Sequence, residues 1–445
     1  MNPWHILSLT YLWMVLAHVN MSQAQSGLVN LSPQDKQIIV DSITNKLLTT
    51  YVFPELAAEM AEVIQANMDK GAYESIHTPF DFANRLADDL IAVSQDKHIR
   101  VEYHPQTQAA QPQGSTAEER ETHHNRRIAR LTRENFGFKE LKILEGNIGY
   151  LDLRSFADVE YGGPTAVSAM NFLSSSDAII IDLRNNTGGS PAMIQLLSSY
   201  LFPSPPIHLN TFYWRPSDRY TQTWTLPHVQ GKRSPETPVY ILTSKRTFSA
   251  AEEFSYNLKH LQRATLIGET TGGGAHPTGA VPATDQFTIW VPSGRAINPV
   301  TNTNWEGTGV SPHVEVAADQ ALGIAHVQAL EYLIEKNDAS ELDSYYQWHL
   351  SSLKSKIEPV MIDAATLNSY VGTYGPRVIS LQKNTLYYQR GEDRMYELIP
   401  VSQDEFELQG FPSFRVRFVS EKNKVTALEM YSDSGYSDQN TRMEE

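Results

Sequence analysis

The 445-residue chain contains no cysteine. This absence excludes disulfide bonds, a thiol nucleophile and metal sites with cysteine ligands, although it does not identify the compartment. Positive charge is also scarce, because 36 Lys and Arg stand against 51 Asp and Glu and the formal net charge is −15. An acidic chain is a poor match for nucleic-acid phosphates and has no general attraction to anionic membranes. We therefore expect no nucleic-acid partner.

Several ligand-binding patterns are missing as well. No His-Glu-x-x-His sequence occurs, and the pair His123-His124 lies in a polar stretch. No complete Walker pattern accompanies the glycine turns, and no solenoid-like repeat is present. We therefore expect neither a metal nor any other cofactor.

Long apolar runs are confined to the start of the chain. Ile6 to Val19 is mainly apolar but too short to span a bilayer comfortably, and Ser22-Gln-Ala24 is typical of a small-x-small cleavage site. The pattern predicts a secretory signal over residues 1–24; an uncleaved anchor is the alternative. We expect the mature protein to be exported, periplasmic or extracellular, without stable membrane insertion.

The length predicts two or three domains, and the first is a helical region over residues 27–103. Apolar residues recur at helical spacing within residues 35–47, and Ser32-Pro33 is typical of a helix cap and first-turn proline. Residues 104–138 are polar, rich in Gln, Arg and His, and without apolar periodicity. We expect this segment to be a linker or an exposed helical excursion.

Residues 139–336 alternate between buried strands and amphipathic helices, which predicts a sheet with helical cover. The expected strands are 149–153, 178–183, 239–242 and 265–267. Residues 337–360 are expected to form a polar connection. In residues 361–445, short alternating segments separated by turn-like polar residues predict a small all-β domain.

Ser249 stands where one of these strands turns directly into a helix. Ala250, Phe254 and Leu258 recur at helical spacing after it. A hydroxyl at a helix start lies among backbone N–H groups without intrahelical partners, and such groups can stabilise a developing oxyanion. However, Ser249-Ala-Ala-Glu252 also fits the capping box. This segment alone therefore leaves two interpretations open, a nucleophile and a helix cap.

Two glycine-rich turns follow other predicted strands, and glycine lets the backbone approach another group closely. One amide of the first turn, at Gly188 or Gly189, could be a second oxyanion donor opposite Ala250. A tight structural turn and a phosphate cradle are the alternatives. The second turn is either a place where substrate passes close to the backbone or a mobile edge loop, and its three glycines are Gly272, Gly273 and Gly274.

A serine nucleophile needs a general base, commonly His or Lys. His98 ends a turn just before an alternating run, where a fixed side chain can project into a cleft. Glu306 lies in a later loop and could orient that imidazole. Each also has an ordinary interpretation, as a structural histidine and a loop carboxylate.

Together these segments resemble the carboxyl-terminal-processing (tail-specific) serine peptidase family, in the branch that includes the tricorn protease core and the modules of interphotoreceptor retinoid-binding protein. The matching segments follow the family's order: 149–153, 181–189, 243–252, 267–274 and 305–312. The region before Asp96 resembles the amino-terminal helical domain of that branch. The predicted fold is thus mixed α/β and multidomain, with a ClpP/crotonase-like α/β core, an amino-terminal helical domain and a small carboxyl-terminal all-β domain.

The resemblance implies that Ser249 is the nucleophile and that the glycines of the second turn bind substrate. It also implies oxyanion donors at the amides of Ala250 and of the Gly188–Gly189 turn. The processing peptidases pair their serine with a lysine, and the matching position here is Gly274. The Ser/Lys dyad is therefore absent.

The tricorn-like alternative uses a histidine near the start of the catalytic region and a late glutamate, which match His98 and Glu306. The serine that completes the tricorn tetrad is replaced by Lys97. The PDZ domain common to the processing peptidases is not visible, and the polar segment 104–133 occupies its place.

The leading hypothesis is an exported serine endopeptidase that cleaves peptide or protein substrates through an acyl-enzyme at a Ser-His-Glu site. A rival hypothesis is a non-catalytic binding protein for a small hydrophobic ligand or peptide on the same fold. In a third, the carboxyl-terminal β domain is an interaction module attached to an inert core.

Overall fold

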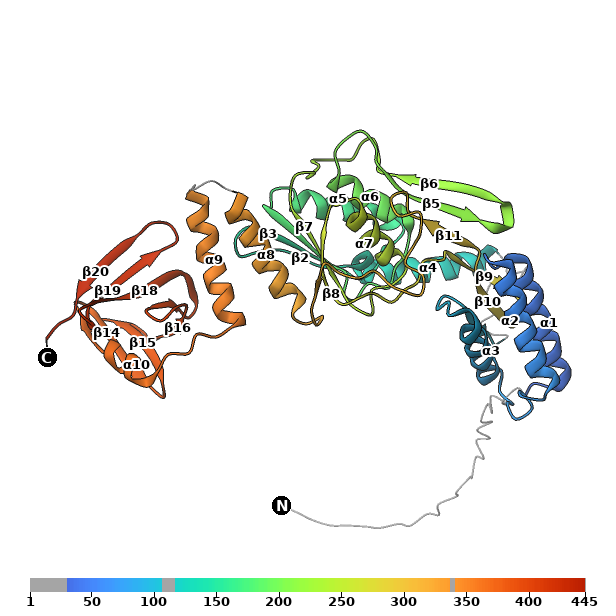
Figure 1. The fold of residues 1–445 in the computed structure, drawn as a ribbon, viewed down its shortest axis with the longest axis horizontal. Helices are drawn as coiled ribbons and strands as arrows, with labels where there is room; N and C mark the ends of the chain where they lie inside the picture. The colour runs from blue at the N-terminus through green and yellow to red at the C-terminus, as the bar shows by residue number, and fades with distance from the viewer. Residues whose placement is uncertain (1–29, 106–116, 337–340, 445) are drawn as a thin grey trace, which may run out of the picture.

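The computed structural model describes residues 30–105, 117–336 and 341–444. They form a helical region, an α/β core and a β domain that follow one another along the molecule (Figure 1). The predicted signal, residues 1–24, lies outside the described residues. Within the described part of the chain, no helix is long and apolar enough to cross a membrane.

The helical region consists of three helices that each begin with a proline in the first turn. They are α1 (Pro33–Thr50), α2 (Pro54–Asp69) and α3 (Pro79–Ser94). The Ser32 hydroxyl caps α1 by accepting from the Asp35 N–H at 3.1 Å, and the Asp35 carboxylate accepts from the Ser32 N–H in return. The predicted start of this helix at Ser32-Pro33 is therefore confirmed.

The apolar faces of these helices pack on a small antiparallel sheet that joins distant parts of the chain. Its order is β1-β10-β9, with β1 (Arg100–Tyr103), β9 (Thr278–Pro282) and β10 (Phe287–Pro292). Three side chains of β10 lie in the same apolar cluster as the helices: Phe287, Ile289 and Val291. The helical region thus shares its core with a strand of the α/β region. This packing also brings the turn before β1 next to the α/β region.

The segment expected to be a linker or a helical excursion is an excursion. Most of its described residues form α4 (Ala117–Arg133), whose described side chains are largely exposed. A short 3₁₀ turn, η1 (Asn135–Gly137), then leads into the core.

The core contains a six-stranded sheet of order β12-β8-β7-β4-β3-β2, in which only the β2–β3 pair is antiparallel. β4 and β7 are buried along their whole length, which explains their continuous apolar sequences. The four strands predicted from the sequence are confirmed. The strands are β2 (Phe138–Leu144), β3 (Ile148–Leu153), β4 (Ala178–Asp182), β7 (Val239–Thr243), β8 (Thr265–Gly268) and β12 (Val314–Glu315).

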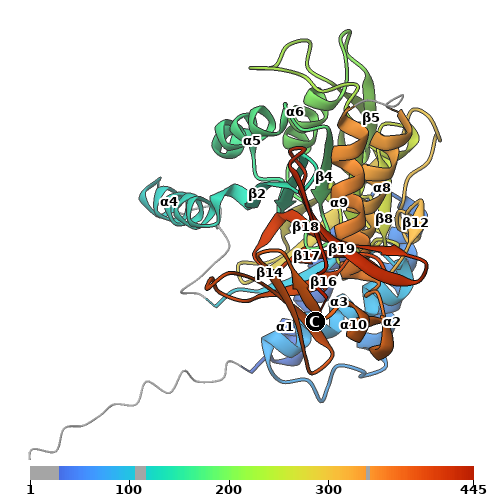
Figure 2. The same ribbon diagram turned by 90° about the vertical axis from the view of Figure 1, so that its left-hand side faces the viewer.

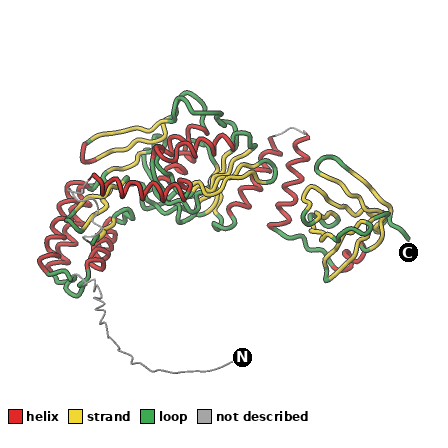
Figure 3. The backbone as a smooth tube through the Cα atoms, turned by 180° about the vertical axis from the view of Figure 1, so that it is seen from behind, coloured by secondary structure: helices red, strands yellow, loops and turns green. Residues whose placement is uncertain are grey.

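Helices cover both faces of this sheet (Figures 1 and 3). The helices of one face are α5 (Val159–Leu173), α6 (Pro191–Leu201) and α7 (Ala250–His260), and those of the other are α8 (Ala321–Lys336) and α9 (Glu341–Ile357). The polar connection expected over residues 337–360 is mostly α9, so that expectation is corrected. Tyr346 and Leu350, one helical turn apart, are buried in the apolar cluster that α8 forms with this face of the sheet.

A second core sheet extends toward the helical region (Figure 1). It has the order β11-β5-β6, with β5 (His208–Trp214), β6 (Arg219–Trp224) and β11 (Gly294–Ile297). The turn η2 (Arg215–Ser217) joins β5 to β6, and the Arg215 guanidinium donates to the Leu48 carbonyl of α1 at 2.7 Å.

The carboxyl-terminal domain contains α10 (Ala364–Tyr370) and eight antiparallel strands in sequential order (Figure 2). A bridge between Tyr374 and Arg442 joins the first strand to the segment after the last, so the sheet closes into a barrel. The predicted all-β domain is confirmed, but closure was not predicted. The strands are β13 (Gly372–Tyr374), β14 (Arg377–Gln382), β15 (Thr385–Arg390), β16 (Tyr396–Pro400), β17 (Glu405–Leu408), β18 (Phe411–Glu421), β19 (Lys424–Ser432) and β20 (Ser437–Thr441).

Candidate active site

Ser249 occupies a strained turn between β7 and α7. Its φ of 55° and ψ of −122° lie outside the regions that a non-glycine residue ordinarily adopts. Such a conformation costs on the order of 1–3 kcal/mol and persists only where surrounding contacts impose it. Strain of this kind is common at catalytic residues, and a strained strand-to-helix turn exposes a nucleophile to a cleft.

Hydrogen bonds between the ends of β4 and β7 impose this turn. The Thr247 hydroxyl donates to the Leu183 carbonyl at 2.8 Å and accepts from the Ser244 N–H at 2.9 Å. The Phe248 N–H donates to the Asn186 carbonyl at 3.1 Å. The residues before Ser249 are therefore fixed to the neighbouring strand end.

Glu252 supplies the carboxylate half of the capping box. It accepts from the Ser249 N–H at 2.8 Å, whereas its own N–H donates to the Ser249 carbonyl at 2.8 Å. Ser249 thus stands at the N-cap of α7, and with Glu252 it has the arrangement of a capping box. The sequence allowed both a helix cap and a nucleophile, and the geometry is compatible with both.

The same carboxylate holds the second glycine turn against the start of α7. Fully buried, Glu252 accepts from the Thr271 hydroxyl at 2.5 Å and from the N–H groups of Gly273 and Gly274 at 2.6 and 2.8 Å. Burial raises the pKa of Glu252 against the lowering effect of these hydrogen bonds. Sequence reasoning missed this role, although the capping-box pattern had marked the residue.

The first glycine turn lies directly beside Ser249. A Cβ atom built on Gly188 would lie 2.9 Å from the Ser249 Cβ and 3.1 Å from the Ala250 nitrogen, so only glycine fits. Among the described residues, the Ala250 N–H forms no backbone hydrogen bond, whereas the Gly188 N–H donates to Asn186 Oδ1 at 2.9 Å. Of the two glycine amides predicted as oxyanion donors, Gly188 is thus engaged, and the better partner for Ala250 is Gly189.

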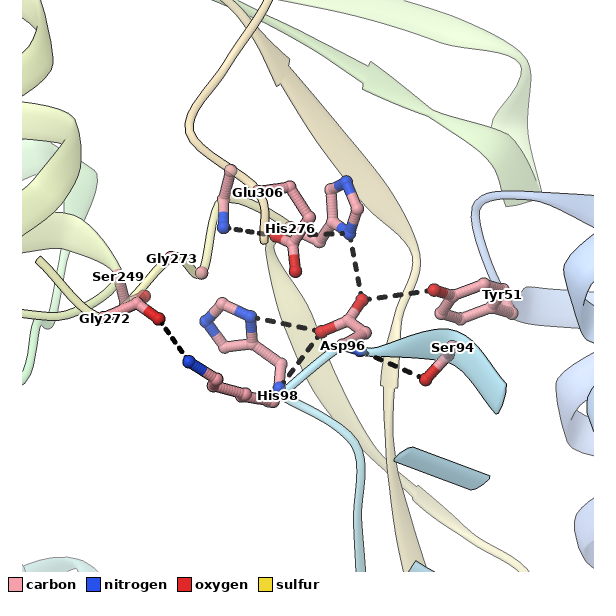
Figure 4. A network of polar contacts seen from close by, with 12 residues as sticks. Tyr51, Ser94, Asp96, His98, Ser249, Gly272, Gly273, His276 and Glu306 are labelled. Carbon is pink, nitrogen blue, oxygen red and sulfur yellow. Dashed lines mark hydrogen bonds and ion pairs between the residues drawn. The ribbon is translucent and has the colours of Figure 1, made fainter. Parts of the chain in front are cut away.

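His98 lies between Asp96 and the Ser249 turn (Figure 4). It is buried, its ring lies 4.7 Å from the Phe248 ring, and its Nδ1 is 3.5 Å from Asp96 Oδ1. Neither ring nitrogen forms a hydrogen bond with a described residue. The expected Ser249–His98 hydrogen bond is therefore not made here, which is common in enzymes without bound substrate.

Gly274 and His98 exclude any side chain at the position of the dyad lysine. A Cβ atom on Gly274 would lie 2.6 Å from His98 Cε1 and 2.3 Å from Phe248 Cζ. Because the two rings occupy this space, a lysine could enter only if they moved. The His98 imidazole therefore occupies space that the lysine side chain of a Ser/Lys dyad would need.

The structure places Asp96, rather than the predicted Glu306, next to His98. Asp96 Oδ2 lies 2.9 Å from His276 Nδ1 and accepts from the Tyr51 hydroxyl at 3.2 Å. Glu306 Oε2 accepts from the Ala275 N–H at 2.5 Å and lies 3.4 Å from His276 Nδ1. Glu306 forms no ion pair with His98, but the two are close enough for the charge of His98 to lower the pKa of Glu306, and the buried Oε1 of Glu306 has no hydrogen-bond partner among the described residues. The pattern Asp96-x-His98 was visible in the sequence. The contact of Asp96 with His276, 180 residues later, was not.

The pKa values of the two carboxylates in this network shift in opposite directions. Burial alone would raise the pKa of Asp96, but hydrogen bonds and charge from His276 and His98 outweigh it and lower the pKa. Burial and the nearby Asp96 charge raise the pKa of Glu306. Asp96 is therefore the anion that can stabilise a positive charge on His98.

Among the described residues, Asp96, His276 and Glu306 form one group that could hold a metal, since one donor atom of each lies within 4.8 Å of the others. The 2.9 Å between Asp96 Oδ2 and His276 Nδ1 is the length of a hydrogen bond. The contacts of this group are therefore explained without a metal.

Lys97, at the position of the missing tetrad serine, donates instead to the Gly272 carbonyl at 2.6 Å.

A cavity of about 330 Å³ opens beside Ser249. Its walls include Phe212, Trp214 and Trp305, together with amides of both glycine turns. The volume is at the small end of ligand sites, which suits a single side chain of a bound peptide.

Two family models match the chain. Peptidase family S41 matches residues 147–316, and the N-terminal domain of S41 peptidases in eukaryotic interphotoreceptor retinoid-binding protein matches residues 20–132. The first match contains Ser249 and Glu306, and the second contains His98. The two models thus meet at the candidate site.

Several solved structures are similar in arrangement. A candidate peptidase from Parabacteroides merdae is 18% identical, with 68% of this chain and 98% of that chain covered and a TM-score of 0.46. The photosystem II D1 C-terminal processing protease is 15% identical, with 65% and 94% covered and a TM-score of 0.41. The tricorn protease is 14% identical, with 72% and 37% covered and a TM-score of 0.40.

Proposed function

Because the chain belongs to peptidase family S41 and is a serine-type hydrolase, we propose that it cleaves peptide bonds with Ser249 as nucleophile and His98 as general base. The observation that carries this proposal is the strained conformation of Ser249, a residue that lines the cavity. We also propose, from the apolar segment Ile6–Val19, that the protein is exported.

In the proposed reaction, Ser249 Oγ attacks the substrate carbonyl carbon as His98 accepts the hydroxyl proton on the nitrogen that does not face Asp96. The Ala250 and Gly189 amides stabilise the tetrahedral oxyanion. His98 then donates the proton to the leaving amine, which leaves an acyl group on Ser249. Water, deprotonated by His98, hydrolyses this ester and regenerates the serine.

Asp96 takes the role of the carboxylate in this scheme. Its lowered pKa keeps it ionised, so it stabilises the imidazolium that forms during attack. His276 and Tyr51 hold Asp96 in place, and Glu306 contacts His276. The Ser-His-Glu site expected from the resemblance is thus replaced, in our proposal, by a Ser-His-Asp site with Glu306 behind it.

Labelling with a fluorophosphonate probe tests this assignment. We expect stoichiometric labelling of wild type that is lost in Ser249→Ala and strongly slowed in His98→Ala, with the folded state checked by circular dichroism. If the folded wild-type protein remained unlabelled, the non-catalytic binding hypothesis would be favoured. Equal labelling of wild type and Ser249→Ala would contradict Ser249 as nucleophile.

A further inference from the structure

The cavity beside Ser249 contains a carboxyl group that peptide-bond cleavage does not use. Glu253 follows Ser249 by four residues, so it lies on the same side of α7 at about 6 Å along the helix axis. Its N–H donates to the Ser249 carbonyl at 3.0 Å. The residue is 4% exposed and lines the cavity. Glu253 is therefore at the depth that a long side chain of a peptide substrate reaches when the substrate backbone is bound at Ser249.

Glu253 forms no ion pair with any described residue. Its Oε1 accepts from Asn210 Nδ2 on β5 at 3.2 Å, which is a neutral partner. The other titratable residue that lines the cavity is His276, which already contacts two carboxylates. A buried carboxyl group without a counter-charge is unfavourable, and burial raises the pKa of Glu253 to about 7. No Lys or Arg is among the described residues that line the cavity.

Aromatic side chains form the walls between Ser249 and Glu253. Phe212 and Trp214 come from β5, the strand that also supplies Asn210, and Trp305 comes from the loop before Glu306. Trp305 is 2% exposed and its indole N–H donates to the Gly274 carbonyl at 2.7 Å, so this ring is fixed. Aromatic faces and a carboxylate together are the groups that bind ammonium and guanidinium ions in proteins.

We propose that this cavity binds the side chain on the amino side of the scissile bond, and that Glu253 makes lysine or arginine the preferred residue there. The proposal rests on the proposed function, because it needs the acyl group to lie at Ser249. In the complex, the substrate cation pairs with Glu253 and lies against the aromatic walls. The neighbouring amides hold the peptide backbone.

Two measurements test this proposal. The first compares peptides of one sequence that differ only in the residue before the cleaved bond: arginine, its neutral isostere citrulline, or leucine. We expect wild type to cleave the arginine peptide with a kcat/KM about 10²-fold higher than the citrulline peptide. In Glu253→Gln this ratio should fall to about one, whereas Glu335→Gln, an exposed position on α8, should keep the wild-type ratio. Faster cleavage of the leucine peptide, or an unchanged ratio in Glu253→Gln, would overturn the proposal.

The second measurement does not need turnover. Benzamidine binding is measured by calorimetry in Ser249→Ala and in the double variant Ser249→Ala/Glu253→Gln. Binding to the first and loss of at least about tenfold in affinity in the second would support the cation site even if the protein cleaved no peptide. Equal affinity of the two variants would overturn it. Failed fluorophosphonate labelling with intact benzamidine binding would contradict the proposed function alone.

Discussion

Residues with positive φ occur in both the β domain and the α/β core, and Ser249 of the core differs from those of the barrel in its position. In the barrel, Lys383-Asn384 and Lys422-Asn423 form two-residue turns between paired strands, where positive φ matches the strand twist. In the core, Ser249 has positive φ at a helix start, where the backbone is usually extended. Positive φ reverses the chain in the barrel and also in the core, at Asn147 between β2 and β3 and at Asp218 between β5 and β6, whereas at Ser249 it exposes one side chain.

Buried charges show the same contrast. In the barrel, Arg415 pairs with Glu405 at 2.6 Å and lies over the Trp348 ring. Around Ser249, Glu253 pairs with no cation in the described part of the chain, and Glu306 and Asp96 share His276. An unpaired buried carboxyl group and a strained backbone therefore occur together at the cavity. Both features are typical of functional sites.

The largest loss of activity should follow removal of the Ser249 hydroxyl. Ser249→Ala should lower kcat/KM in a fluorogenic peptide assay by at least about 10³-fold, because the acyl-enzyme cannot form. The free energy of unfolding, measured with urea, should fall by no more than about 1 kcal/mol, the usual contribution of an N-cap hydroxyl. Ser249→Gly should be equally inactive but more stable by about 1 kcal/mol, because glycine accepts positive φ. Equal stability of all three proteins would contradict backbone strain at this position.

The next largest effect separates the two candidate carboxylates. Asp96→Asn should lower kcat/KM by about 10²–10⁴-fold because His98 loses its anionic partner. Glu306→Gln should cost only about tenfold, since this side chain acts through His276. The reverse order would restore Glu306 as the partner of His98.

A smaller loss is expected from crowding the histidine. Gly274→Ala should lower kcat/KM by about 10-fold and the free energy of unfolding by about 1–3 kcal/mol, because the new methyl group displaces the His98 and Phe248 rings. Gly279→Ala on β9 is the matched control, since a Cβ atom there meets no other atom within 4 Å. Similar effects of both substitutions would show that backbone freedom, not ring contact, is what matters.

Glu253→Gln should alter stability in a pH-dependent way. Burial raises the pKa of Glu253 to about 7, so the folded wild-type protein binds the proton of this carboxyl group more tightly than the unfolded chain does. Wild type therefore loses stability as the pH rises from about 4.5 to 7. The variant lacks this loss and should be more stable than wild type at pH 8 by on the order of 3 kcal/mol, but not at pH 4. Urea titrations at both pH values measure the difference. If the difference in stability were the same at both pH values, the pKa of Glu253 would not be raised by folding.

The smallest effect on activity is expected from the barrel. Phe418 is buried and stacks on Tyr370 at 4.0 Å, so Phe418→Ala should destabilise the β domain by about 3–5 kcal/mol. At temperatures where the domain stays folded, kcat/KM should remain within about twofold of wild type, because Ser249 and its partners lie elsewhere. A parallel loss of activity would show that the β domain takes part in catalysis.

Much of the fold could be predicted because its signals are local. The buried strands, the capped start of α1 and the short alternating strands of the β domain each depend on neighbouring residues. Helix α9 was missed although Tyr346, Leu350 and Leu353 recur at helical spacing. Barrel closure was missed because strand pairing at Tyr374–Arg442 joins segments far apart in sequence.

The sequence by itself determined which residue types are available for chemistry: a serine at a strand-to-helix junction, two glycine turns, no cysteine and no dyad lysine. Only the tertiary structure decided how they are paired, because β1 must pair with β10 before His98 can approach the Ser249 turn. The same packing places Asp96, not Glu306, beside the imidazole and leaves Glu253 facing the cavity. Distances between residues remote in sequence depend on how sheets and helices pack, and no local pattern contains them.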